Sequence, residues 1–268
     1  MQGGTIERGV LRYRHREKPD VSIVVPAHNE EAAILAMLNS IAETVAKVAH
    51  HRCEVIIVDN ASTDDTAGIA EHAGAKVVSE PRKGVSYARQ RGLEEANTPV
   101  LIGSDGDTVV PPTWVDSHLS KYDDPGVVGV TGRFRFDHVH PLFHGYKACA
   151  SVVQSAFRLL RAIGAVEKEH PERGQTGANF SYRREAALQI GYEPGMNLGE
   201  DMILGMKLEE VGRIIRDMSD EICVTTSGRR YQHTKEIVDL AKRKITLLFT
   251  RQLYKRIHTA IDFEDYRD

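Results

Sequence analysis

The sequence predicts an α/β fold, in which a mostly parallel β-sheet carries helices on both faces. Short apolar runs alternate with helical patterns between residues 21 and 111, in the order β-α-β-α-β-α-β. Strands that alternate with helices in this way form parallel sheets that are covered on both sides. The 268 residues are 41% hydrophobic and 27% charged, which is ordinary for a globular protein with one sizeable core.

The first strand is predicted at residues 21–26, an apolar run that ends in a proline. Asn29 and the acids behind it indicate an N-cap and the start of a helix. Apolar residues recur at steps of three and four from residue 34 to residue 48, the pattern of a helix with one buried face. Two further strands are predicted at 53–58 and 76–79, each followed by a helix.

The fourth strand, at residues 100–102, leads into two carboxylates, Asp105 and Asp107, separated by Gly106. We expect the glycine to let the backbone turn, so that both carboxylates approach one centre. Hard oxygen ligands suit Mn²⁺ or Mg²⁺, and Mg²⁺ usually takes one or two carboxylates plus substrate phosphates. The pair alone is equally consistent with a solvated Asp-Gly turn.

Polar residues after the other strands favour the metal site over the solvated turn. Asn29, Asp59 and Arg82 each lie just past a predicted strand, as Asp107 does. Ligands of parallel sheets bind beyond the carboxyl ends of the strands, so the fold would bring these residues to one edge.

Composition argues against several classes of protein. A net charge of −3 gives no electrostatic footprint for nucleic acid. The three cysteines are scattered and form no C-x-x-C pair, which indicates neither a disulfide framework nor a structural zinc site. The first residues are polar and basic rather than a leader peptide, and no apolar run is long enough to span a membrane. We therefore expect a cytoplasmic protein, either free or peripheral on the cytoplasmic face of a membrane.

Four segments of this half resemble the motifs of family 2 inverting glycosyltransferases, the nucleotide-sugar enzymes of the GT-A fold. Residues 21–31 resemble V-S-I-V-x-P-x-x-N-E, and residues 55–66 resemble I-I-V-D-x-x-S-x-D-x-T. Residues 84–92 resemble G-x-x-x-A-R-N-x-G, with Gln90 in place of asparagine, and residues 105–111 resemble D-x-D with its following proline. The chain has no P-loop, and no G-x-G-x-x-G opens a helix, which disfavours NTPases and dinucleotide enzymes.

The resemblance implies a nucleoside pocket at the ends of the first two strands. Pro26, Ala27 and Glu30 would line this pocket, and Asp59 would accept hydrogen bonds from the base. The alternative is that the two acids belong only to a helix start and a turn.

The resemblance also assigns roles to charged residues after the third and fourth strands. Arg82, Lys83 and Arg89 would flank the nucleotide, although a surface basic cluster is the alternative. Asp105 would contact the ribose or the metal, and Asp107 would bind the metal. The cation would bridge the diphosphate and stabilise the charge on the leaving group.

The middle of the chain is predicted to form the acceptor half. A short helix is expected at 114–122, and a strand at 128–136, where apolar and polar residues alternate, would have one buried face and one open basic face. A further helix at 142–163 is interpreted as a core helix of this half, with a membrane interface as the alternative.

A second block, at residues 174–184, resembles the family's G-x-N-x-x-x-R, which precedes an E-D dipeptide at the head of a helix. Inverting transfer is a single displacement, so one carboxylate must take the proton of the acceptor hydroxyl. The resemblance makes Asp201 this base and places Glu200 and Asn179 on the acceptor side. Two acids at a helix start are also what the helix dipole favours, so a purely structural role is the alternative.

The last predicted strand, in residues 221–227, leads into a basic loop. By the resemblance, His233 would complete the metal shell, while Arg229 and Arg230 would bind the diphosphate. A lone exposed histidine is the alternative for His233. The chain lacks the Q-x-x-R-W of processive members, which argues against polymer synthesis.

Three regions follow from this reading: a flexible basic arm at 1–20, a GT-A domain at 21–232, and an amphipathic C-terminal helix and tail at 233–268. The domain would divide into a nucleotide-sugar half, 21–112, and an acceptor half, 113–232. The arm would be either a solvated tail or a contact with anionic lipid or phosphate. The C-terminal helix would pack on the domain or a partner, including a second copy in a homodimer, or dock on anionic lipid.

The predicted function is a metal-dependent inverting glycosyltransferase of the hexosyltransferase type, which moves one sugar from a nucleotide-diphosphate donor to an acceptor hydroxyl. UDP is the expected nucleotide because it is the most frequent one in the family that the chain resembles. The acceptor would be a saccharide, a lipid or a small molecule. Two other readings stay open: a noncatalytic sugar-nucleotide binding or scaffold protein, and a GT-A-like nucleotidyltransferase. A nucleotidyltransferase would require a glycine-rich loop and a basic residue after the first strand, and residues 26–30 contain neither.

Overall fold

A computed structural model describes residues 6–7, 10–11, 20–48, 51–137, 177–197 and 199–229. One compact unit comprises Met1–Asp137 and Arg173–Ser227, while Gly228 and Arg229 fall in a second unit. The predicted helices at 142–163 and 233–268 lie outside the described residues. Within the predicted basic arm, the described residues include two short antiparallel strands, β1 (Ile6–Glu7) and β2 (Val10–Leu11).

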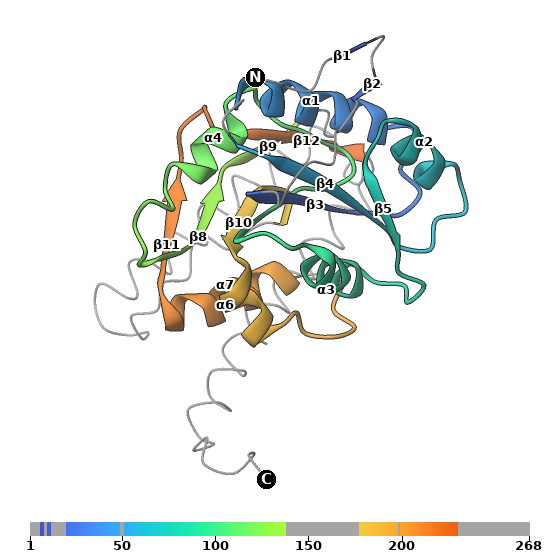
Figure 1. Cartoon of the computed structure of the whole chain (residues 1–268). Coiled ribbons are helices and arrows are strands. Elements are labelled where there is room, and N and C mark those ends of the chain that lie inside the picture. Colours follow the sequence, from blue (N-terminus) through green and yellow to red (C-terminus); the bar gives the residue numbers. More distant parts are fainter. Residues whose placement is uncertain are drawn as a thin grey trace, which may run out of the picture. The chain divides into compact units, whose positions relative to one another are not determined.

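A seven-stranded sheet forms the centre of the first unit (Figure 1). Six strands run parallel to one another, and β10 alone is antiparallel to both of its neighbours. The order is β11-β8-β10-β6-β3-β4-β5. This confirms the predicted α/β class and the mostly parallel sheet. The strands are β3 (Val21–Ala27), β4 (Cys53–Asp59), β5 (Lys76–Ser79), β6 (Val100–Gly103), β8 (Val127–Gly132), β10 (Phe180–Arg183) and β11 (Arg213–Asp217).

Helices cover both faces of the sheet, as Figure 1 shows. Alternate residues of β3 point to opposite faces, so Ile23 and Val25 pack in one core cluster while Val24 packs in the other. The first cluster lies under α1 and α4, and the second lies under α3, α6 and α7. The helices are α1 (Ile34–Lys47), α2 (Thr66–His72), α3 (Val85–Glu95), α4 (Trp114–Leu119), α6 (Arg184–Ile190) and α7 (Glu200–Val211). None of these described helices is long and apolar enough to cross a membrane.

The start of α1 differs from the prediction. Asn29 is not its N-cap, because the helix begins at Ile34 and Asn29 has a left-handed backbone, with φ of 55°. The Asn29 Oδ1 instead accepts a hydrogen bond from the amide of Thr63, at 2.8 Å. The loop after β3 is therefore tied to the loop after β4. The apolar stripe was predicted correctly, since Ile34 and Ile41 are fully buried.

The strand predicted at 128–136 is in fact two strands in different sheets. β8 ends at Gly132, and β9 (Phe134–Phe136) joins a three-stranded sheet with β7 (Thr108–Val109) and β12 (Val224–Thr226). The break occurs because the Arg133 carbonyl accepts hydrogen bonds from the Asn179 side chain and the Val224 amide. On the predicted open face, Arg133 and Arg135 are exposed but Thr131 is buried, and Phe134 of the predicted buried face is exposed.

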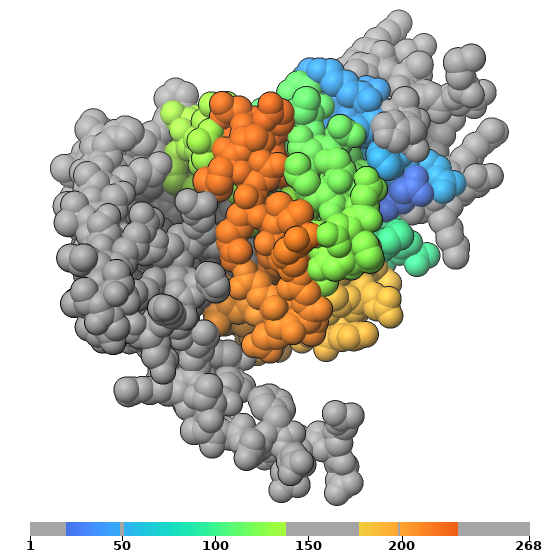
Figure 2. All heavy atoms as spheres, turned by 90° about the vertical axis from the view of Figure 1, so that its left-hand side faces the viewer, coloured from blue at the N-terminus to red at the C-terminus, as the bar shows by residue number. Residues whose placement is uncertain are grey.

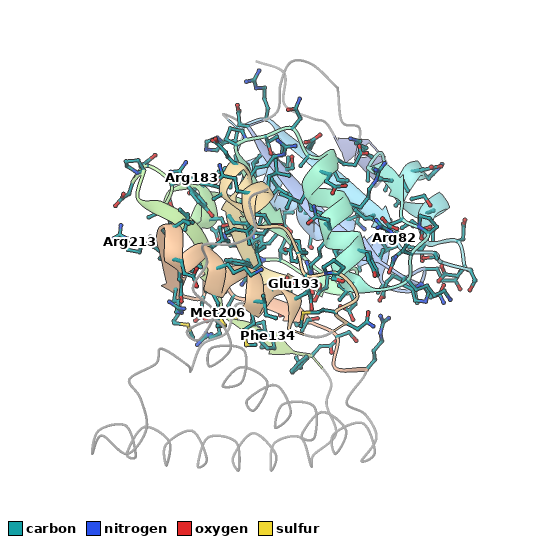
Figure 3. All side chains as sticks on the ribbon, turned by 90° about the horizontal axis from the view of Figure 1, so that it is seen from below. Arg82, Phe134, Arg183, Glu193, Met206 and Arg213 are labelled. Atoms are coloured by element: carbon teal, nitrogen blue, oxygen red, sulfur yellow. The ribbon has the colours of Figure 1, made fainter. Side chains whose placement is uncertain are left out.

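β11 is the edge strand of the sheet on the side that faces the viewer in Figure 2. There the orange segment from α7 to β12 lies beside the green segment around α4 and β8. Arg213 on β11 pairs with Asp124, and its side chain stays 61% exposed, a charge of the kind that discourages edge-to-edge pairing. Arg213 and Arg183 lie at the opposite side of the sheet from Arg82, as Figure 3 shows.

Candidate active site

The acidic turn that follows β6 forms the first part of the site. Asp105 and Asp107 are both half-buried, and Gly106 between them is buried. The backbone at Gly106 is not in the left-handed region, so the turn itself does not demand glycine. Glycine is needed for another reason, because a Cβ there would lie 2.9 Å from Cγ of Glu30. The predicted nucleoside residue Glu30 therefore packs directly on the acidic turn.

Asp107 is held from the other side by the last strand of the small sheet. The Thr226 hydroxyl on β12 donates a hydrogen bond of 3.1 Å to Asp107 Oδ1. Since β7 begins at Thr108, immediately after Asp107, the small sheet fixes both the backbone and the side chain of this residue. No pattern in the sequence indicates the contact with Thr226.

The predicted nucleoside residues lie at the ends of two neighbouring strands. Ala27 and Asp59 are partners in the register of β3 with β4, and Pro26 pairs with Val58 beside them. Ala27 is buried, and its carbonyl accepts the Asn60 amide at 2.8 Å. Asp59 is half-buried, and its Oδ1 accepts the Ser62 amide at 3.3 Å.

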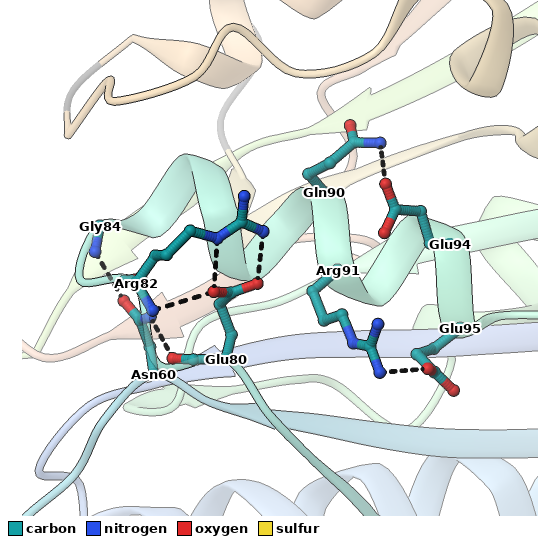
Figure 4. A network of polar contacts seen from close by, with 8 residues as sticks. All are labelled: Asn60, Glu80, Arg82, Gly84, Gln90, Arg91, Glu94 and Glu95. Carbon is teal, nitrogen blue, oxygen red and sulfur yellow. Dashed lines mark hydrogen bonds and ion pairs between the residues drawn. The ribbon is translucent and has the colours of Figure 1, made fainter.

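Beside this strand end, Asn60 organises the loop that enters α3 (Figure 4). Its Nδ2 donates to the carbonyls of Glu80 and Arg82, at 3.0 and 2.7 Å, and its Oδ1 accepts the Gly84 amide at 2.8 Å. The Arg82 guanidinium makes two bonds of 2.8 Å to the buried Glu80 carboxylate and lies over the Tyr87 ring. Hydrogen bonds from Arg82 lower the pKa of Glu80 to about 2. The guanidinium is thus oriented, although 63% of the side chain is exposed.

Arg89 on α3 occupies the centre of the site rather than its surface. Its buried guanidinium places Nη2 2.7 Å from Asp105 Oδ1 and Nε 3.2 Å from both Glu200 Oε1 and Asp201 Oδ1. A buried cation needs such partners, because desolvation otherwise disfavours its charge. Arg89, predicted to flank the nucleotide, contacts three carboxylates, from the end of β6 and the start of α7.

A glycine makes room for this cluster. Gly177, in the short 3₁₀ turn Gly177–Asn179, accepts a hydrogen bond of 3.4 Å from Arg89 Nη1 through its carbonyl. A Cβ at Gly177 would lie 1.9 Å from Arg89 Nη2 and 2.4 Å from Asp201 Oδ2. The glycine of the predicted second block therefore lets α3, the 3₁₀ turn and α7 meet.

Asn179, predicted on the acceptor side, lies inside the core. It is fully buried, and its Oδ1 accepts the Trp114 Nε1 hydrogen at 2.8 Å and lies 2.9 Å from His118 Nε2. Its Nδ2 donates to the carbonyls of Arg133 and Ile222, at 2.8 and 2.7 Å. All of these contacts are internal, and they hold the 3₁₀ turn in place.

The electrostatics of Asp201 single it out among the carboxylates of the site. Burial raises the pKa of Asp201 well above its ordinary value of 3.8; Arg89 opposes this shift, and Glu200 adds to it. A carboxyl with a raised pKa can accept a proton near neutral pH more effectively than an ordinary one. Asp201 is therefore the carboxylate of this cluster whose pKa is raised.

The donor set on the acidic side fits a hard divalent cation. Asp105 and Asp107 supply carboxylate oxygens, and Mn²⁺ or Mg²⁺ would complete its shell with phosphate oxygens and water. Within the described ranges, no group of three or more His, Cys, Asp or Glu could hold a metal ion. Of the remaining predicted residues, Lys83 is exposed and Arg229 belongs to the second unit, while Arg230 and His233 lie outside the described residues.

The chain is similar to known proteins in sequence and in fold. Residues 22–191 match the sequence model of the family described as Glycosyl transferase family 2. The probable glycosyltransferase YdaM of Bacillus subtilis is 28% identical over 234 residues, which are 81% of this chain and 54% of that protein. An uncharacterized glycosyltransferase of Mycobacterium tuberculosis is 37% identical over 115 residues, which are 43% of this chain and 49% of that protein. The chain thus spans about half the length of these relatives.

Two solved structures show the same fold. Glucosyl-3-phosphoglycerate synthase of M. tuberculosis, in complex with Mn²⁺, UDP and glucosyl-3-phosphoglycerate, has a TM-score of 0.62 at 23% identity, over 87% of this chain and 80% of that one. The mannosyltransferase PcManGT of Pyrobaculum calidifontis, in complex with GDP-Man and Mn²⁺, has a TM-score of 0.58 at 18% identity, over 80% and 59%. At these identities, the likeness concerns the fold alone.

Proposed function

The chain belongs to glycosyl transferase family 2, and from this premise we propose that it moves one sugar from a nucleotide-diphosphate sugar to an acceptor hydroxyl. The observation that carries the proposal is the sharing of Arg89 by Asp105 and Asp201. The first carboxylate belongs to the proposed donor side and the second to the proposed acceptor side. Their contact with one guanidinium supports a transfer reaction between these two sides.

The reaction is a single in-line displacement. The acceptor oxygen attacks the anomeric carbon, the bond from that carbon to the diphosphate breaks, and the configuration at the carbon inverts. Asp201 takes the hydroxyl proton as the new bond forms, a role that a carboxyl of raised pKa can perform. Glu200, which also contacts Arg89, helps to hold the guanidinium beside Asp201.

Asp105 and Asp107 would hold Mn²⁺ or Mg²⁺, which when bound stabilises the negative charge on the departing diphosphate. Thr226 keeps the Asp107 carboxylate in place through its hydrogen bond. Asp59 and Glu30 would contact the nucleoside from the ends of β4 and β3. We propose UDP as the nucleotide, which the complex of the synthase from M. tuberculosis with UDP and Mn²⁺ supports.

A thermal-shift screen tests the proposal. Nucleoside diphosphates and sugar nucleotides, each with and without Mn²⁺, are added to the full chain and the melting temperature is recorded. A ligand that binds only the folded state raises this temperature, so UDP and UDP-sugars are expected to do so when Mn²⁺ is present. Sugar nucleotides that bind are then tested for transfer to candidate acceptors. No shift with any nucleotide would refute the proposal, and binding without turnover would favour a noncatalytic binding protein.

A further inference from the structure

The hydrogen bonds around Arg89 are unequal. Nη2 donates to Asp105 Oδ1 at 2.7 Å, whereas Nε donates to Glu200 Oε1 at 3.2 Å. Asp201 Oδ1 lies at the same 3.2 Å from Nε. Within the described part of the chain, this buried oxygen accepts no hydrogen bond. Since Nε carries one hydrogen, Glu200 and Asp201 compete for a single donor.

The charges around Arg89 are also unequal in number. One guanidinium faces three carboxylates, and its side chain is only 5% exposed, so water screens the cluster weakly. Whatever binds Asp105 competes with the guanidinium for that carboxylate. A guanidinium released from Asp105 has Glu200 and Asp201 as its remaining charged partners.

We propose that Arg89 is a positioning residue that couples the donor side of the site to the base, so that occupation of Asp105 by the cation of the donor strengthens the contact of Arg89 with Asp201. The coupling rests on the function proposed above. It makes the acceptor side respond to a loaded donor side without a change of fold. The packing at Gly177, where a methyl group would collide with both Arg89 and Asp201, keeps the two groups close enough for this exchange.

Coupling between two sites is reciprocal, so Asp201 must affect what binds at Asp105. An ionised Asp201 is a counter-ion for the guanidinium that the cation displaces. Replacing Asp201 with neutral asparagine removes this counter-ion while keeping nearly the same shape. The substitution is therefore expected to weaken the binding of Mn²⁺ with UDP, and only where Arg89 is present to transmit the change.

The test is a double-mutant cycle, read by calorimetric titration of UDP with Mn²⁺ into the full chain. Asp201→Asn is expected to weaken binding about three- to fivefold in the wild-type background, a coupling at the lower end of the usual range, and less than about twofold in Arg89→Lys. Lysine keeps the charge but lacks the fork that reaches Asp105 and Asp201 together. Glu210→Gln, an exposed site on the same helix, controls for the loss of one negative charge and should leave binding unchanged.

If Arg89→Lys fails to fold, a second measurement tests the coupling instead. The Nε–H resonance of Arg89 is followed in the wild type and in Asp201→Asn while Mg²⁺ and UDP are added. It is expected to shift in the wild type and to shift less in the variant. Equal weakening by Asp201→Asn in both backgrounds, or an unchanged resonance, would overturn the coupling. If the wild type binds no UDP with Mn²⁺ or Mg²⁺, the coupling fails together with the UDP-dependent form of the proposed function; if it binds but shows no coupling, only the coupling fails.

Discussion

Asp105 and Asp201 bind the same guanidinium, with Nη2 of Arg89 2.7 Å from Asp105 Oδ1 and its Nε 3.2 Å from Asp201 Oδ1. One carboxylate follows a central strand of the sheet, and the other opens a helix on its face. Groups that share a buried partner do not respond independently to substitution. Each single variant in this cluster must therefore be compared with the corresponding double variant.

Asp201→Asn should nearly abolish sugar transfer. Asparagine cannot accept the proton, and loss of a general base typically lowers kcat by about 10²- to 10⁴-fold. UDP affinity in the presence of Mn²⁺ should weaken by no more than about fivefold, because the amide removes one counter-ion and leaves the donor ligands in place. The pair of measurements is kcat by UDP release and affinity by calorimetry, with Glu210→Gln as the control. Retained turnover would remove Asp201 as the base.

The same variant should alter stability in a pH-dependent way. Burial raises the pKa of Asp201 above 3.8 in the folded chain. Between pH 3.8 and this raised pKa, the folded chain therefore binds more protons than the unfolded chain. The free energy of unfolding then falls as pH rises through this window. Asparagine does not ionise, so Asp201→Asn should gain stability relative to the wild type on going from pH 4 to pH 8.

The expected size of this gain follows from the linkage. A pKa raised by one corresponds to about 1.4 kcal/mol, or roughly 3–6 °C in melting temperature for a chain of this size. Arg89 keeps Asp105 and Glu200 as partners in the variant, so its own charge stays paired. Thermal melts of both proteins at pH 4, 6 and 8 provide the check. A difference in melting temperature that does not change with pH would contradict the raised pKa.

Local patterns were enough to predict the strands β3, β4, β5 and β6 and the polar residues that follow them. The apolar run of β3 and the carboxylates after β6 are continuous in sequence, so periodicity and turn chemistry identify them. The partners of Arg89 could not be predicted in this way, because Asp201 is distant in sequence and reaches Arg89 only in the folded chain. One signal was present: Arg89 lies next to Ala88 and one turn before Leu93, on the buried stripe of its helix. A charge on such a stripe requires partners.

Other differences from the prediction have the same physical origin. The break between β8 and β9 depends on a hydrogen bond from Asn179, which is distant in sequence. Asn29 favours the neighbouring loop over its own helix because Thr63 offers an amide within 2.8 Å. In both cases a hydrogen bond to a residue distant in sequence outweighs the local preference for helix or strand, because such preferences are small.

Asp107→Ala should remove the part of nucleotide affinity that depends on metal. The variant loses one of two carboxylates proposed to hold the cation, while Asp59 and Ala27 at the neighbouring strand ends are untouched. Calorimetric titrations of UDP with and without Mn²⁺ should then give similar affinities. Thr226→Val, which deletes only the hydrogen bond to Asp107 Oδ1, should lose less of the Mn²⁺ effect. A full Mn²⁺ effect in Asp107→Ala would overturn the metal assignment.

His118 should make the protein sensitive to acid. Burial lowers the pKa of His118 from 6.5 to about 4, so below pH 6.5 the unfolded chain binds a proton that the folded chain excludes. Stability is then lost as pH falls from about 6.5 to about 4, by roughly 3 kcal/mol for this shift. Denaturant titrations from pH 4 to pH 8 measure the slope, which should flatten in His118→Gln. The exposed His72→Gln should leave it unchanged, and an equal slope in all three proteins would contradict the prediction.

Gly177→Ala tests whether the closeness of α3 and α7 matters for chemistry. The added Cβ would lie 1.9 Å from Arg89 Nη2 and 2.4 Å from Asp201 Oδ2, so the ion pair must open or the 3₁₀ turn must shift. Overpacking of this kind typically costs about 1–3 kcal/mol. Gly126→Ala, in an exposed loop, is the matched control.

The decisive comparison for Gly177→Ala is between kcat and nucleotide affinity. The atoms nearest to the added Cβ belong to Arg89 and Asp201 and not to Asp107, so UDP should still bind with Mn²⁺. The rate of transfer should fall by at least tenfold, since a misplacement near 1 Å can cost about 10²-fold. A variant that melts lower but keeps its full kcat would show that Gly177 serves stability alone, and that transfer tolerates a loosened contact between Arg89 and Asp201.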